Sequence, residues 1–227
     1  ATPPPIDAET TLIYAAPTGA GTFLPGALEE ARAVSALAAP AIARVGGKAT
    51  ESGFRSDLSS SWRAVHFACH ATARGIRTDE LSDRERTIDE IMVSNYLWLA
   101  PTLGDEATSS ADGKLTLREI RSLDPDVAPD LVVLSACQTA MGEAEEGLEI
   151  LSVADAFHSI GVRHLIATLW PVYDRSSKRL FTEFYRIRSE GVPDGLALAA
   201  AKKLLALDPA FAHPVHWSGV VLYRPGW

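Results

Sequence analysis

The sequence has few cysteines, few basic residues and no long apolar run, and each shortage excludes a class of protein. Two cysteines among 227 residues cannot form the disulfide framework of a small secreted domain, so we expect a reducing compartment, with the cytoplasm as the default. A net charge of −8 argues against a nucleic-acid-binding face, because such a face needs clustered Lys and Arg to neutralise phosphates. No stretch approaches the roughly 20 consecutive apolar residues that span a bilayer, so no membrane contact is expected either.

What remains is the composition of an ordinary globular protein, with 47% apolar and 22% charged residues. At 227 residues the chain can form one ample domain. Residues 1–10 contain three successive prolines and are expected to be a linker, and residues 11–227 are expected to be the domain. No signal peptide is recognisable and the chain begins at Ala1, so we expect a further N-terminal portion upstream.

Two strongly apolar runs end abruptly in chemically reactive side chains. The run over residues 131–136 stops at Cys137, and the run over residues 62–69 stops at His70. Buried parallel strands read as continuous apolar runs, and functional groups in open α/β sheets gather where such strands end. One strand end that offers a thiol and another that offers an imidazole predict a Cys/His catalytic pair assembled by the fold.

Strand-like and helix-like patterns alternate along most of the chain. Strands are predicted at 12–16, 41–45, 65–69, 131–136, 164–169 and 217–223, and helices at 26–37, 50–60, 147–160, 174–188 and 193–207. Strands that alternate with helices need crossover connections, which favour a mainly parallel sheet. The expected fold class is therefore α/β, a three-layer sandwich in which helices flank that sheet.

Several pieces of the sequence, in this order, are similar to one known family. Residues 66–70 (HFACH) and 132–140 (VVLSACQTA) resemble the two signatures of the CHAT domain, a caspase-like cysteine peptidase family related to separase. Residues 165–174 resemble a third block, and residues 184–185 and 213–217 resemble its closing pieces. The resemblance covers most of the chain and implies a caspase-like fold.

The resemblance also implies a role for each residue at the two strand ends. Cys137 is the expected nucleophile and His70 the expected general base, and no cofactor is needed. The backbone N–H groups of Cys137 and Ala71 are the expected oxyanion donors. The family places Gly where this chain has Ala71, but a backbone donor survives that change unless the turn demands a positive φ. The stretch 73–115 is a second departure, since it is longer and more charged than the family leads us to expect.

His66 is the alternative to His70 and raises the question of a metal site. Four residues of an extended strand span ~13 Å, so His66 and His70 cannot both reach one substrate atom or one metal ion. His66 is therefore expected to be buried or to lie behind the site. No metal is expected, because no CxxC or HExxH pattern occurs in the chain.

Two carboxylates are candidates for substrate binding. Asp174 lies in a block similar to the separase block whose aspartate receives a P1 arginine. The simpler interpretation, which we favour from the sequence, is a helix N-cap, because Asp174 stands at the start of the predicted helix. Asp155, on the helix after the cysteine strand, is a weaker second candidate. The acidic stretch 141–149 is interpreted either as a solvated loop or as the activation loop that follows the nucleophile in caspase-like enzymes.

These observations predict a cysteine endopeptidase that cuts a particular protein target. In line with the family, an upstream regulatory or sensor module and a bacterial origin are expected. A catalytically silent adaptor that binds protein partners through the same fold is the alternative, and intact Cys137 and His70 argue against it. A different α/β hydrolase or transferase is disfavoured, because the chain has no GxSxG elbow, phosphate-binding glycine loop or dinucleotide fingerprint.

Overall fold

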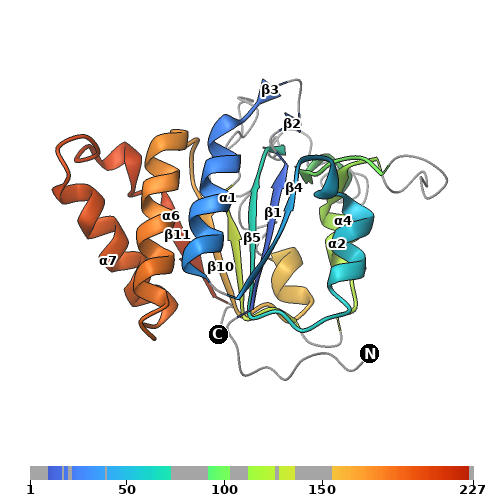
Figure 1. Ribbon diagram of the computed structural model, residues 1–227. Helices are drawn as coiled ribbons and strands as arrows, with labels where there is room; N and C mark the ends of the chain where they lie inside the picture. The colour runs from blue at the N-terminus through green and yellow to red at the C-terminus, as the bar shows by residue number, and fades with distance from the viewer. Residues whose placement is uncertain are drawn as a thin grey trace, which may run out of the picture.

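A six-stranded sheet lies at the centre of the protein (Figure 1). The computed structural model describes residues 10–16, 18–19, 22–38, 40–72, 92–102, 112–125, 128–135 and 155–224. The sheet has the order β11-β10-β9-β5-β1-β4, with β1 (Thr11–Ala16), β4 (Ala41–Val45), β5 (Ala64–Cys69), β9 (Leu131–Leu134), β10 (His164–Thr168) and β11 (Val220–Tyr223). All neighbouring strands are parallel except β10 and β11. The prediction of a mainly parallel sheet is confirmed.

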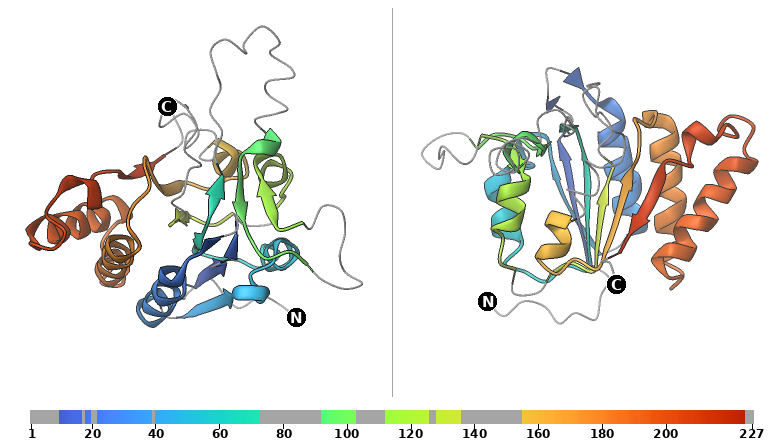
Figure 2. Two further views of the ribbon diagram at one scale, coloured as in Figure 1. Left: turned by 90° about the horizontal axis from the view of Figure 1, so that it is seen from above. Right: turned by 180° about the vertical axis from the view of Figure 1, so that it is seen from behind.

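Helices cover both faces of this sheet and form the outer two layers of the predicted sandwich (Figure 2). One face carries α1 (Pro25–Leu37) and α6 (Asp174–Arg188), with α7 (Asp194–Leu207) packed outside α6. The other face carries α2 (Glu51–Asp57), α4 (Leu117–Arg121) and the helical residues 155–159. The remainder of the predicted helix 147–160 lies outside the described residues.

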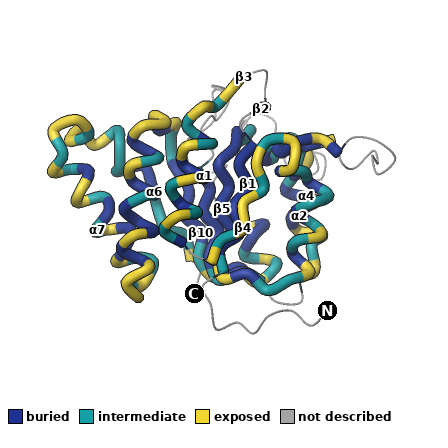
Figure 3. The backbone as a smooth tube through the Cα atoms, viewed as in Figure 1, coloured by how far each residue is buried: buried dark blue, intermediate teal, exposed yellow. Residues whose placement is uncertain are grey.

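The alternation of side chains along each strand divides the core between the two helical layers. On β5, Val65, Phe67 and Cys69 pack toward α2 and α4, whereas Ala64 and Ala68 pack toward α1 and α6. Every residue of β1 and β5 is buried, as the dark central strands of Figure 3 show. Because both faces are covered, these strands have no solvent side, and their sequences read as continuous apolar runs.

Two small sheets extend the carboxyl edge of the central sheet and were not predicted. β2 (Thr18–Gly19) pairs with β3 (Thr22–Phe23), while β6 (Ala71–Thr72), β7 (Tyr96–Trp98) and β8 (Lys114–Thr116) form the other sheet. Strands of two or three residues are too short to show a period in the sequence. A 3₁₀ turn, η3 (Pro214–His216), likewise delays β11, so the strand predicted from 217 begins at Val220.

A buried carboxylate joins the two short helices of the α2–α4 face. Glu51 is fully buried, and its Oε1 accepts hydrogen bonds from Arg55 Nε at 3.1 Å and Nη2 at 2.9 Å. The same guanidinium lies 3.3 Å from the Glu119 carboxylate on α4. Burial raises the pKa of Glu51 to about 7, against the opposing effect of Arg55, and the Glu119 charge adds to the rise.

Glu51→Gln is expected to remove part of the pH dependence of stability. Because folding raises the pKa of Glu51 above its ordinary 4.5, the carboxyl stabilises the fold fully below that pH, and this contribution is lost as the pH rises through about 7. Urea unfolding across this range should show the free energy of unfolding of the variant improving relative to wild type as the pH rises.

Glu29→Gln is the control. Lys178 lowers the pKa of the exposed Glu29 carboxyl, so the contribution of this carboxyl to stability is lost as the pH falls, which is the opposite pH dependence. A difference between Glu51→Gln and wild type that stays constant with pH would contradict the raised pKa of Glu51.

Candidate active site

The two predicted strand ends lie side by side at the carboxyl edge of the sheet. β5 and β9 are parallel neighbours with Phe67 opposite Leu134, and the pairing continues past β9, since the Ser135 N–H donates to the Phe67 carbonyl at 2.8 Å. His70 follows β5 directly. Cys137 stands two residues after Ser135 in the sequence and lies outside the described residues. The sheet therefore brings the predicted base next to the chain segment that leads to the predicted nucleophile.

His70 connects the central sheet to the small sheet of β6, β7 and β8. Its carbonyl accepts a hydrogen bond from the Trp98 N–H at 2.8 Å, and the residue is only 1% exposed. Burial shields the imidazole from bulk water and strengthens its electrostatic interaction with any group held against it.

Ala71 has a backbone N–H that the small sheet does not use. Ala71 lies opposite Leu97, and the neighbouring Trp98 N–H bonds to the His70 carbonyl. In an antiparallel ladder this makes Ala71 and Leu97 a pair of the non-hydrogen-bonded type, whose N–H groups point away from the partner strand. Ala71 also has strand backbone, so the position makes no demand for the left-handed φ that only Gly adopts easily. Ala71, where the resemblance leads us to expect Gly, therefore keeps a backbone N–H that points away from β7.

A hydroxyl pair ties the end of the cysteine strand to the first turn of α6. The Oγ atoms of Ser135 and Ser177 lie 2.8 Å apart, and Ser177 is buried. Ser135 continues the side-chain alternation of β9, in which Leu131 and Val133 face the α1–α6 layer. No sequence pattern pointed to this pair, because only the packing of α6 on the sheet brings together two serines 42 positions apart.

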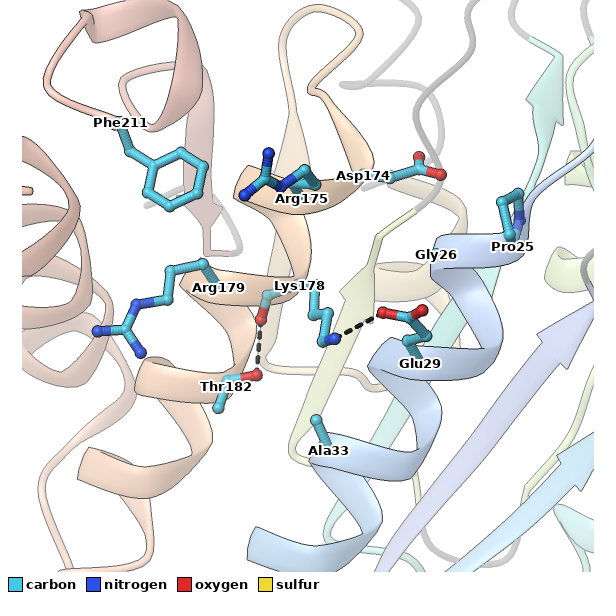
Figure 4. A pocket seen from close by; sticks show the side chains of 10 residues that line it. All are labelled: Pro25, Gly26, Glu29, Ala33, Asp174, Arg175, Lys178, Arg179, Thr182 and Phe211. Carbon is cyan, nitrogen blue, oxygen red and sulfur yellow. Dashed lines mark hydrogen bonds and ion pairs between the residues drawn. The ribbon is translucent and has the colours of Figure 1, made fainter. Parts of the chain in front are cut away.

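Asp174 is the first residue of α6, and the expectation that it is the N-cap is wrong by one position. The N-cap is Tyr173, and no side chain makes a capping hydrogen bond there. The Asp174 carboxylate is exposed and forms no hydrogen bond or ion pair with the described part of the chain. It lies against Gly26 at the start of α1, as Figure 4 shows. A Cβ at Gly26 would lie 2.7 Å from the Asp174 Cβ, so glycine is what lets the two helices begin this close together.

Asp155, the second candidate for substrate binding, lies near the opposite edge of the sheet. It is exposed and belongs to the helical residues 155–159, which lead through Gly161 into β10. The first residue of β10, His164, is fixed at the amino edge by its N–H bond to the Asp130 carbonyl at 2.9 Å. The structure therefore does not bring Asp155 to the edge that carries His70.

His66 is buried in the core, as expected, between α1 and α6. Its Nε2 lies 2.8 Å from Glu30 Oε1, and its Nδ1 lies 3.3 Å from the Tyr185 hydroxyl. Burial raises the pKa of Tyr185, which keeps the phenol protonated and able to donate to Nδ1. Glu30 was not among the residues predicted from the sequence. Its helical spacing from Ala27 and Val34, on the apolar side of α1, was nevertheless a signal that this carboxylate is buried against a polar partner.

The described residues offer neither a metal site nor a membrane span. They contain no group of three or more His, Cys, Asp or Glu side chains that could hold a metal ion. Within the same ranges no helix is long and apolar enough to cross a membrane.

Comparison with solved structures shows which known fold this one resembles. The chain is similar to the structure described as the crystal structure of the Arg-specific cysteine proteinase gingipain R (RgpB), with a TM-score of 0.53 and 11% sequence identity. The match covers 96% of this chain and 46% of that one, so the chain spans less than half the length of the proteinase. The architecture is therefore the caspase-like α/β fold, a mostly parallel sheet flanked by helices.

The sequence comparison then gives the family. A family model described as CHAT domain matches residues 2–225, and the chain belongs to this family. The resemblance inferred from the motifs is thus confirmed. Comparison with curated proteins gives no match.

Removal of either hydroxyl of the Ser135–Ser177 pair is expected to destabilise the fold. Ser135→Ala and Ser177→Ala should each lower the free energy of unfolding by roughly 0.5–1.5 kcal/mol, because each leaves the other hydroxyl without its partner. In a double-mutant cycle followed by urea unfolding, the double variant should lose clearly less than the sum of the single losses. Ser189→Ala, at an exposed hydroxyl that donates to the Arg186 carbonyl, is the control. Strictly additive losses would show that the two hydroxyls do not interact.

Proposed function

We propose that this CHAT domain is a cysteine endopeptidase that uses Cys137 and His70 as a catalytic dyad. The observation that carries the proposal is the pairing of β5 with β9, which brings His70 to the edge where the chain leads on to Cys137. Membership of the family and the caspase-like architecture support a cysteine peptidase-like domain.

In the proposed reaction the Cys137 sulfur attacks the carbonyl carbon of the scissile peptide bond while His70 takes the thiol proton. The N–H groups of Ala71 and Cys137 donate to the developing oxyanion. When the intermediate collapses, the C–N bond breaks and His70 returns the proton to the leaving amine. Water then hydrolyses the thioester with His70 as the base, and the free thiol is restored. No cofactor takes part.

Asp174 is proposed as the carboxylate that receives a basic P1 side chain. Asp174 does not act as the helix cap that the sequence favoured, because no side chain makes a capping hydrogen bond at the start of α6. An exposed carboxylate without a partner in the described chain is available to a cationic substrate side chain. We further propose that the target is a specific protein, cut in the cytoplasm under the control of an upstream module.

A silent adaptor is the second candidate function, and the burial of His70 favours it. A base that is 1% exposed reaches a substrate only if the site rearranges, whereas an adaptor needs no access to it. The two functions differ in the reactivity of Cys137, which a dyad activates and an adaptor does not.

Cleavage of a diverse peptide library, read by mass spectrometry, is expected for the wild-type protein and not for Cys137→Ala. His70→Ala should lower the rate roughly 10²- to 10⁴-fold, because the thiol then loses its general base. Labelling of Cys137 by a peptidyl electrophile should slow in the same variant. If wild type cuts no peptide and Cys137 also ignores the electrophile in the presence of the upstream module, the adaptor function is correct.

Asp174→Asn is expected to change specificity and leave the fold intact. Cleavage after Arg or Lys should fall by roughly tenfold or more, since a charge-assisted bond is replaced by a neutral one. Cleavage after apolar residues and the melting temperature should stay close to wild type. Asp155→Asn is the matched control and should alter neither. An unchanged P1 preference in Asp174→Asn would remove Asp174 from the substrate site.

A further inference from the structure

A hollow of about 910 Å³ lies between the start of α6 and the segment 210–216. Three aromatic rings line it and contact one another in a row, with the ring centroids of Tyr173 and His216 5.4 Å apart and those of Phe211 and His216 5.7 Å apart. Tyr173 is 65% exposed, which is unusual for so large an aromatic side chain. A concave, aromatic and accessible surface of this kind is typical of ligand-binding sites.

The walls of the hollow are held in place by the core. The Trp170 Nε1–H donates to the Val215 carbonyl at 3.1 Å, which fixes the segment of η3 against the end of β10. Trp170 also packs directly on Gly219, where a Cβ would lie only 2.5 Å from the indole. A binding surface that is already formed loses little entropy when a peptide docks on it.

Arg175 is the Arg or Lys side chain that lines this hollow, and it has no partner in the described part of the chain. Lys178 is paired with Glu29 at 2.6 Å and Arg179 with Glu183 at 2.9 Å. Arg175, by contrast, forms no ion pair or hydrogen bond with the residues that the structure describes. In Figure 4 it points toward Phe211, whereas Asp174 points the other way, toward Pro25. Both residues line the hollow, with the Asp174 carboxylate directed toward Pro25 and the Arg175 guanidinium directed toward Phe211.

The hollow lies close to the strand that leads to the proposed nucleophile. Ser177, two residues after Arg175 on the same helix, is 2.8 Å from Ser135. Two residues of helix rise ~3 Å along the axis, and each residue of an extended peptide spans ~3.3 Å. A peptide whose scissile bond lies at the carboxyl edge therefore reaches Arg175 within a few residues.

We propose that Arg175 and the aromatic hollow form a specificity subsite for an acidic side chain that neighbours an aromatic one in the substrate. The guanidinium offers paired N–H donors that match a carboxylate, and the rings of Tyr173, Phe211 and His216 receive the aromatic side chain. This inference rests on the proposed peptidase function and adds the substrate class. With the neighbouring Asp174 directed toward Pro25, the preferred target carries a basic residue at the cleavage site and an acidic-aromatic pair a few positions away.

The test uses an octapeptide library that carries Glu-Phe at each position in turn, with matched Gln-Phe and Glu-Ala libraries. At one position, kcat/KM for Glu-Phe should exceed that for Gln-Phe by ~5- to 10-fold, the discrimination expected of a partly exposed charge pair. Arg175→Gln should abolish this ratio, and Arg175→Glu should reverse it, so that Gln-Phe peptides are cut faster than Glu-Phe peptides. Arg186→Gln, the same neutralisation at an exposed arginine farther along α6, should preserve it.

Binding to the Cys137→Ala protein separates the subsite from the chemistry. Fluorescence anisotropy of the labelled peptides should show the same Glu-over-Gln preference, lost in the Cys137→Ala/Arg175→Gln double variant. If the preference is Arg175-dependent in binding but wild type cuts nothing, the subsite stands and the peptidase proposal fails. If wild type cuts peptides with no Glu-Phe preference, or with one that Arg175→Gln retains, the subsite is wrong and the peptidase stands.

Discussion

The parallel pairing of β5 with β9 is the constraint on which the site depends. Each strand ends at the same edge, and the ladder runs on through the bond between the Ser135 N–H and the Phe67 carbonyl. Register in a sheet buried on both faces is strongly fixed, since a slip by one residue would exchange the α1–α6 and α2–α4 faces of the core. The relative position of His70 and the segment toward Cys137 is therefore set by the whole sheet.

The layer of α1 and α6 sits on this sheet through polar as well as apolar contacts. His66 on β5 meets Glu30 of α1 and Tyr185 of α6 inside the apolar core. Ser135 and Ser177 repeat the arrangement nearer the carboxyl edge. Breaking a buried polar contact leaves a group unsatisfied and costs more than the contact itself contributes. These contacts make the first turn of α6, with its opposite charges, a fixed feature beside the strand ends.

Much of the fold was predictable, because its determinants repeat along the chain. The continuous apolar runs of β1, β5 and β9 reflect burial on both sides, and the helical spacing in α6 and α7 reflects one-sided packing. The short strands of the small sheet and η3 are two or three residues long, and elements of this length show no period in the sequence. The N-cap prediction for Asp174 failed by one residue, which is the usual uncertainty of a helix boundary read without the backbone.

The sequence by itself determined the layer order, the family and the identity of the candidate dyad, since motifs and periodicity are local properties of the chain. Only the tertiary structure showed that the Ala71 N–H points away from β7, that Asp155 lies near the amino edge of the sheet and that the side chains of Asp174 and Arg175 point in different directions. The partners Glu30 and Ser177 also emerged only there. Each of these depends on contacts between segments far apart in the chain, which no local pattern encodes.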